Sequence, residues 1–205
     1  MAKSENNFLQ NIPEVEYLES RFVFIENATL KTNLSISLQY VTFLIMVEEE
    51  FTLQGPISYS LYKNIILHTA SIVEGTLHHL LEALIKRKEI DSEKVLGNEE
   101  IYVNKKVLYK TEDGLEVCGI HIKKKPVKLK RNTNFVVINR ACKKAILLSK
   151  KLFEDVENLR EQRNKIHLAG LSEVDDLYEK KDIQKAFDTA KEVLDLAERK
   201  LNRSS

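Results

Sequence analysis

Cysteine, glycine and proline are scarce in this chain of 205 residues, which has two, six and three of them respectively. The two cysteines, Cys118 and Cys142, match no metal-ligand spacing and build no disulfide framework, which excludes a small disulfide-stapled or zinc-ribbon protein. Cysteines used so sparingly predict a reducing, cytoplasmic location. Few glycines and prolines leave few breaks in the chain, so the composition favours helices.

An excess of one charge and a long apolar run are also missing. The chain has 32 basic and 31 acidic residues, a formal net charge of +1, so any attraction to nucleic acid must come from a local patch. The longest apolar run, Val41–Val47, is far shorter than the roughly 18–20 residues that a membrane span needs. The polar N-terminus lacks the apolar segment of a signal peptide. We therefore expect a soluble protein without a membrane partner.

Several common catalytic motifs are absent from the sequence. There is no P-loop, no Gly-rich dinucleotide fingerprint and no Gly-x-Ser-x-Gly elbow, which argues against common nucleotide hydrolases, Rossmann enzymes and serine hydrolases. His78 and His79 invite a metal site, but neighbouring helical side chains point about 100° apart and no further ligand completes the set. We predict no metal and no cofactor.

Helical periodicity covers most of the chain. In residues 57–89 apolar side chains recur every three or four positions, which predicts one long core helix with a single buried face. Gly55-Pro56 separates it from the helices before it. The other predicted helices are Pro13–Glu26 and Asn33–Leu53 within residues 13–54, and Asn134–His167 and Val174–Leu201 within residues 134–201.

Residues 99–132 interrupt the helical pattern. Apolar and polar residues alternate in short steps between Ile101 and Leu129, and Asp113-Gly114 is typical of a hairpin turn. We therefore expect a small β-hairpin or meander inserted between helices. The whole chain is then predicted to be a single, mainly α domain, an up-and-down helical bundle with a small β insertion.

The most informative stretch is the Arg/Asn/His cluster in residues 159–167, Leu-Arg-Glu-Gln-Arg-Asn-Lys-Ile-His. Arg163 projects into the middle of the apolar face of the predicted helix, where an unpaired charge is costly to bury. Three explanations are open: Arg163 pairs with a buried acid, faces a cleft, or lies on solvated surface because the apolar face ends at Leu159. Four polar side chains spaced i, i+3, i+4 and i+7 share this stripe, namely Arg160, Arg163, Asn164 and His167.

Arginine and histidine together suit phosphate chemistry. The planar guanidinium group matches phosphate oxygens, and histidine accepts or donates a proton near neutral pH. RNA carries its own nucleophile, the 2′-OH, so a histidine and an arginine suffice for strand cleavage without a metal. Asn164 is a candidate for orienting His167 or for binding the backbone or a ribose.

The block Leu-Arg-x-x-Arg-Asn-x-x-His resembles the Arg-x(4–6)-His motif of the HEPN superfamily (higher eukaryotes and prokaryotes nucleotide-binding), many members of which are metal-independent endoribonucleases. Two registers compete. Arg160 and His167 have six residues between them, within the family's range, whereas Arg163 is followed by the expected polar residue, Asn164. Either arginine is therefore a candidate for the motif position. The resemblance covers residues 57–89 and 134–201.

The resemblance implies a fold, an activity and partners. HEPN domains are helical bundles in which an earlier long helix often carries a polar residue that faces the motif. Glu74 is the candidate here, at the edge of an apolar face, although it is equally interpreted as an ordinary boundary glutamate. His167 would be the general acid or base and Arg160 or Arg163 the phosphate clamp.

The activity implied is that of a metal-independent endoribonuclease. It would act on RNA as a homodimer in which two motif helices meet at one composite cleft. A role in toxin–antitoxin systems, phage defence or RNA processing follows from the resemblance, with an antitoxin or another protein as a further partner. The alternative is a non-catalytic HEPN-like module that binds RNA, a nucleotide or a protein.

A basic strip lies at the end of the predicted β insertion. Residues 123–131 contain six basic side chains and no acid. Such a strip attracts a phosphate backbone without reading its sequence. It is equally typical of a solvated hairpin edge, where lysines discourage further strand pairing. The RNA-binding candidates are Lys123, Lys124, Lys125, Lys128, Lys130 and Arg131.

Overall fold

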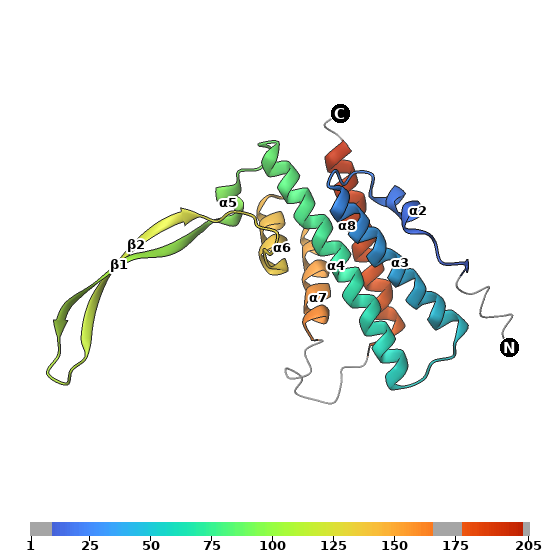
Figure 1. Cartoon of the computed structure of the whole chain (residues 1–205), viewed down its shortest axis with the longest axis horizontal. Helices are drawn as coiled ribbons and strands as arrows, with labels where there is room; N and C mark the ends of the chain where they lie inside the picture. The colour runs from blue at the N-terminus through green and yellow to red at the C-terminus, as the bar shows by residue number, and fades with distance from the viewer. Residues whose placement is uncertain (1–9, 166–177, 203–205) are drawn as a thin grey trace.

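The computed structural model describes residues 10–165 and 178–202. Within these residues the chain is mainly helical, with one two-stranded antiparallel sheet. The helices form a bundle, and the sheet is a long arm that projects from one side of it (Figure 1). The predicted fold class, a mainly α protein with a small β insertion, is confirmed at this level.

The bundle is built around α4 (Pro56–Lys86), the predicted long core helix. Its sequence is apolar on most sides, and fifteen of its residues are buried, as expected for a helix surrounded by others. It ends at Lys86, before the predicted Glu89. The helices that pack against it are α3 (Ala28–Glu50), α6 (Phe135–Lys144), α7 (Lys150–Asn164) and α8 (Lys180–Asn202) (Figure 1).

A glycine lets α3 approach α4 closely. A Cβ atom added to Gly75 would lie 3.1 Å from Cδ2 of Leu34, so a larger residue would require the Leu34 side chain to shift. The start of α3 therefore lies beside this part of α4. That start is at Ala28, because Oδ1 of Asn27 accepts a hydrogen bond from the Leu30 amide at 3.0 Å. The predicted start at Asn33 was too late because this cap was overlooked.

The predicted single N-terminal helix was wrong. The chain instead forms α2 (Val15–Glu19), followed directly by the 3₁₀ helix η1 (Ser20–Phe22). Phe22, Phe24 and Ile25 are all buried. Three inward side chains within four residues exceed what one helical face can bury, so the chain leaves the helix to bury all three.

The predicted continuous helix Asn134–His167 was also wrong. It is two helices, α6 and α7, which pack against each other across the break. At the end of α6 the amide of Leu147 donates to the carbonyl of Cys142, and the amide of Ile146 to that of Lys143, each at 3.0 Å. These two bonds form a Schellman motif, which ends a helix with one residue in the left-handed conformation.

Ile146 occupies the left-handed position, with φ of 57°. Glycine is strongly favoured at this position. Because the residue here is isoleucine, the sequence did not indicate that the helix ends. The new helix α7 then begins at Lys150 because the hydroxyl of Ser149 accepts a hydrogen bond from the Leu152 amide at 3.1 Å. The part of the predicted motif helix from Ile166 onward lies outside the described residues.

The β insertion is a hairpin that follows the short helix α5 (Ser92–Leu96). Its strands are β1 (Asn98–Lys110) and β2 (Glu116–Pro126), paired antiparallel along their whole length. The predicted turn at Asp113-Gly114 is confirmed, with φ of 86° at Gly114. Both strands extend away from the bundle (Figure 1).

Among the described helices, α3 alone is long and apolar enough to cross a membrane. Its most apolar 18-residue window has a mean hydropathy of 1.2, and 22% of that window is buried. This helix contains the apolar run Val41–Val47. One such helix is weak evidence for a membrane span. Its side chains Leu34, Val41 and Leu44 are buried within the bundle.

The left-handed residue at the end of α6 generates a test of this fold. Ile146 is 87% exposed, so its replacement removes almost no packing. The left-handed conformation costs a non-glycine residue roughly 1–2 kcal/mol. Glycine itself costs about 0.5–1 kcal/mol of stability, because it gives the unfolded chain more conformational freedom to lose on folding. We expect Ile146→Gly to raise the free energy of unfolding by up to about 1 kcal/mol in urea titration.

The matched control for this variant is Ile36→Gly, at an exposed position inside α3. Glycine inside a helix is unfavourable, so this change should lower the free energy of unfolding by about 0.5–1 kcal/mol. Opposite signs for the two substitutions are expected. Destabilisation by both would mean that α6 does not end at Ile146.

Candidate functional site

A large open cleft of about 1170 Å³ lies where α3, α4, α6 and α7 meet. Its walls come from the start of α3, the middle of α4, the segment before α6 and the end of α7. The cleft therefore gathers residues that are far apart in the sequence. The predicted site residues that line it are Glu74, Arg131, Arg160, Arg163 and Asn164.

Arg163 is paired with Glu74 across the two helices. Its Nη1 atom lies 2.7 Å from Oε2 of Glu74, and the two side chains are 31% and 23% exposed. Arg163 therefore pairs with a partly buried acid and lines a cleft, as two of the three explanations proposed. The buried face of α7 ends at Leu159, so part of the Arg163 side chain is exposed to solvent. A guanidinium group carries five N–H donors, so the bond through Nη1 leaves donors that a ligand in the cleft can use.

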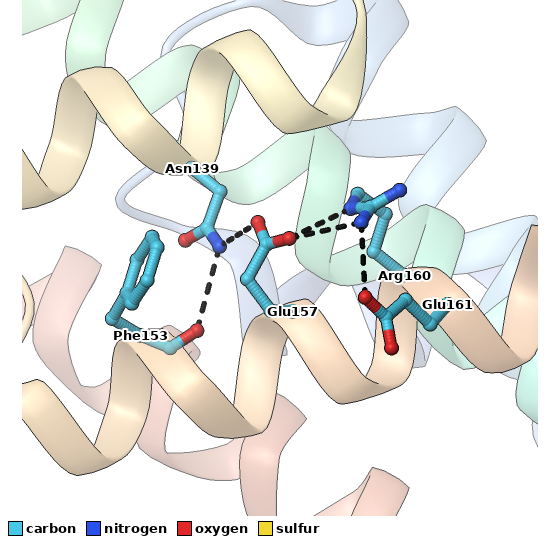
Figure 2. Close-up of polar contacts among 5 residues, drawn as sticks. All are labelled: Asn139, Phe153, Glu157, Arg160 and Glu161. Atoms are coloured by element: carbon cyan, nitrogen blue, oxygen red, sulfur yellow. Dashed lines mark hydrogen bonds and ion pairs between the residues drawn. The ribbon is translucent and has the colours of Figure 1, made fainter.

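Arg160 lies one turn before Arg163 in α7 and is held by acids of the same helix. Its Nη2 and Nε atoms lie 2.9 Å and 3.0 Å from Oε2 of Glu157, a forked contact (Figure 2). Glu161 is a weaker second partner at 3.4 Å. The side chains of Arg160 and Glu157 are 18% and 19% exposed, so solvent screens this pair less than a surface pair.

Asn139 of α6 extends this network into the core. It is fully buried, and its Nδ2 atom donates to Oε1 of Glu157 at 2.6 Å and to the carbonyl of Phe153 at 3.4 Å (Figure 2). Its Oδ1 atom has no hydrogen-bond partner among the described residues. The amide therefore fixes one oxygen of Glu157 while the other oxygen holds Arg160.

The sequence analysis missed both Glu157 and Asn139. Glu157 stands three positions before Arg160 on the same helix, a spacing at which opposite charges meet, so the sequence did contain this signal. Asn139 was out of reach, because its contact with Glu157 requires the unrecognised break that folds α6 back on α7. The side-chain amide of Asn139 thus connects α6, through Glu157, to Arg160 in the cleft.

His167 lies outside the described residues, so its position relative to the cleft is not part of the structure. Asn164 is the last residue of α7, is exposed, and lines the cleft. The two competing motif arginines, Arg160 and Arg163, both line the cleft as well. The choice between them is therefore open.

Two histidines of α4, His78 and His79, also line the cleft. His78 donates through Nε2 to the carbonyl of Lys130 at 2.9 Å, which ties the segment before α6 to α4. His79 is buried, and this burial lowers its pKa, so the ring is held in the neutral form. Among the described residues no group of three or more His, Cys, Asp or Glu side chains is arranged to hold a metal ion.

The basic strip is divided between the arm and the bundle. Lys123, Lys124 and Lys125 lie on β2, and the last two stand opposite Glu100 and Glu99 of β1, so part of their charge is offset. Three more basic residues follow in the segment before α6. Of the six, Arg131 lines the cleft and the three strand lysines do not.

Burial removes one cysteine from consideration as a nucleophile. Cys142 is fully buried in α6, and this burial raises the pKa of its thiol to about 12. The thiolate, which is the reactive form, is then negligible at neutral pH. Cys118 lies on the arm, away from the cleft.

Comparison of the chain with family profiles, with curated proteins and with solved structures finds no match. The residues of the cleft and the sequence motif are therefore what indicate a function.

The buried amide of Asn139 generates a test of this network. In Asn139→Asp an ionised carboxylate replaces a donor that lies 2.6 Å from Glu157, so two like charges meet and two acceptors lose their donor. We expect the free energy of unfolding at pH 7 to fall by about 2–4 kcal/mol in urea titration. The control is Asn158→Asp, an exposed position of α7, which should change it by less than about 0.5 kcal/mol. Equal stability of the two variants would contradict the network.

Proposed function

We propose that this protein is a metal-independent endoribonuclease of HEPN type that cleaves RNA in the cleft between α4, α6 and α7. The observation that carries the proposal is that Arg160 and Arg163 line one cleft, each held by a carboxylate, beside Asn164. His167 of the same motif follows three residues later in the sequence.

The paired carboxylates support this proposal by fixing the two guanidinium groups. An arginine that is already oriented stabilises developing phosphate charge without the cost of reorganising at the moment of reaction. Glu74 fixes Arg163 from α4, and Glu157 fixes Arg160 within α7. The described residues that line the cleft include four cations and three carboxylates, so they present a small positive excess to a bound phosphate; the set is Lys86, Arg131, Arg160 and Arg163 with Glu26, Glu74 and Glu82.

The proposed reaction uses the nucleophile of the RNA itself. His167 takes the proton of the 2′-OH, and the 2′-oxygen attacks the adjacent phosphorus. The bond from phosphorus to the 5′-oxygen breaks, and this oxygen takes up a proton. The products are a 2′,3′-cyclic phosphate and a 5′-OH. Arg160 or Arg163 stabilises the charge on the phosphorane, and Asn164 positions the histidine or a ribose.

The alternative is a non-catalytic module that binds RNA, a nucleotide or a protein. The near balance of charge in the cleft favours it, because a carboxylate beside each arginine also weakens the attraction for phosphate. The homodimer with meeting motif helices, the protein partner such as an antitoxin, and the setting in phage defence stay predictions of the resemblance to HEPN domains.

Cleavage of labelled RNA in the presence of EDTA tests the proposal. We expect the wild type to cut RNA and to leave cyclic-phosphate ends. Of Arg160→Ala and Arg163→Ala, the variant that lacks the phosphate clamp should cut at least about 100-fold more slowly, because it has lost a positioned donor to the transition state. His167→Ala should abolish cleavage, because it removes the group that moves the proton.

Two control variants keep charge and folding comparable. Arg199→Ala removes an arginine from the last turn of α8, and His121→Ala removes an exposed histidine from the arm. Both should cut like the wild type. Cleavage that survives His167→Ala would refute the mechanism. RNA binding without cleavage by the folded wild type would favour the binding module.

A further inference from the structure

The hairpin arm leaves an unusual amount of apolar surface in solvent. β1 has thirteen residues, all of them exposed, and β2 has eleven, most of them exposed. A two-stranded ribbon that packs against nothing is marginally stable at best in water. The arm therefore needs a partner surface. Its exposed large apolar residues are Ile101, Tyr102, Val103, Val107, Leu108, Tyr109, Leu115, Val117, Ile120 and Ile122.

The strand register divides these residues between two faces. Side chains alternate along β2, and residues opposite each other in the ladder share a face. Two register shifts in β1 set Val103 and Leu108 out of the ladder, so that β2 keeps an unbroken alternation. We call one side the Ile120 face. From the bundle outward its pairs are Glu100–Lys124, Tyr102–Ile122, Lys105–Ile120, Val107–Cys118 and Lys110–Glu116.

The charges of the Ile120 face match those of a second Ile120 face that runs in the opposite direction. Opposite charges close it at both ends, Glu100–Lys124 near the bundle and Lys110–Glu116 near the tip. The signs are exchanged between the ends: β1 supplies the acid near the bundle and the base near the tip, where Lys110 and Glu116 form an ion pair of 3.0 Å. Two mainly apolar pairs flank Ile120 symmetrically. A second copy, turned round, therefore meets opposite charge at each end.

The charge along the whole arm has the same polarity. Residues 110–116 at the tip hold one lysine and three acids, a net charge of −2. Near the bundle, residues 98–101 and 122–126 hold three basic and two acidic side chains, a net charge of +1. When two arms lie antiparallel, each acidic tip reaches the basic end of the other arm. Of the predicted RNA-binding lysines of β2, Lys124 lies on the Ile120 face and serves this contact.

We propose that two copies of this chain associate through their arms, with the Ile120 faces packed together about a two-fold axis at Ile120. The arms run antiparallel, so Ile122 of one copy packs on Cys118 of the other, and Glu100 of one meets Lys110 of the other. Lys124 meets Glu116 of the second copy in the same way. Lys105 is the ladder partner of Ile120, so it lies at the axis as well and faces Lys105 of the second copy. The two aliphatic stems pack there, and the two ammonium groups diverge into solvent at the open edge of β1.

This assembly is a closed, isologous contact, which accounts for both the exposed apolar face and the reversal of charge along it. It differs from a dimer formed by meeting motif helices, because each arm extends away from the bundle (Figure 1). It is also independent of RNA cleavage. Its tests measure association, so the failure of one proposal is distinguishable from the failure of the other.

Sedimentation equilibrium of the full chain tests the association. We expect a particle of twice the chain mass of 23.7 kDa. Ile120→Lys buries a charge at the axis and should raise the dimer dissociation constant at least about tenfold. The matched control is Ile101→Lys, which places the same charge on the opposite face of the arm and should leave association unchanged. A monomeric wild type, or a dimer that Ile120→Lys does not weaken, would overturn the proposal.

Disulfide cross-linking tests the antiparallel register itself. Ile122→Cys places a thiol against the native Cys118 of the second copy, and mild oxidation should then yield a covalent dimer. Within one chain these positions are four residues apart on the same strand, too far for a disulfide. Ile101→Cys, on the opposite face, should give no such product, and the buried Cys142 does not interfere. Equal cross-linking of the two variants would exclude this register.

Discussion

The burial of α4 is the constraint on which the rest of the structure depends. Four helices pack against α4, and three of them, α3, α6 and α7, contribute walls of the cleft. Packing against α4 therefore sets the positions of these walls. Gly75 admits α3 to close contact, and Glu74, the residue before it, reaches α7. The Glu74–Arg163 ion pair is therefore a contact between two packed helices rather than a link between loops. Packed helices position a site more precisely than loops do.

The two arginines of α7 differ in what holds them. Arg163 depends on α4 through Glu74, whereas Arg160 depends on α6 through Glu157 and the buried Asn139. Both acids lower the net charge of the cleft while they fix the direction of the guanidinium groups. Such a compromise suits the stabilisation of charge that develops during a reaction, because that charge is localised where the fixed donors point.

The sequence predicted the parts of the fold that depend on periodicity. The repeat of apolar residues in α4 and the Asp113-Gly114 turn of the hairpin identified these elements with nearly their observed bounds. The pairing of Glu74 with Arg163 was among the expected alternatives, since both residues lie at or within apolar faces. The catalytic and RNA-binding roles assigned to these residues stay predictions.

The sequence could not predict features that depend on tertiary context. The break between α6 and α7 was missed because Ile146 adopts a conformation that normally indicates glycine. Asn139 was missed for the same reason, because its hydrogen bond to Glu157 forms only when α6 folds back on α7. The early buried residues Phe22, Phe24 and Ile25 broke the predicted N-terminal helix for a related reason, because packing against the bundle outweighed local helical preference.

The proposed function requires that RNA bind in the cleft between α4, α6 and α7. Backbone amide NMR shifts, measured while an uncleavable 2′-O-methyl RNA is added to the full chain, report where RNA binds. We expect the largest changes at residues 131–134 and 160–164, the two sides of the cleft that carry its arginines. Changes confined to the arm, or none at all at concentrations where RNA binds, would contradict it.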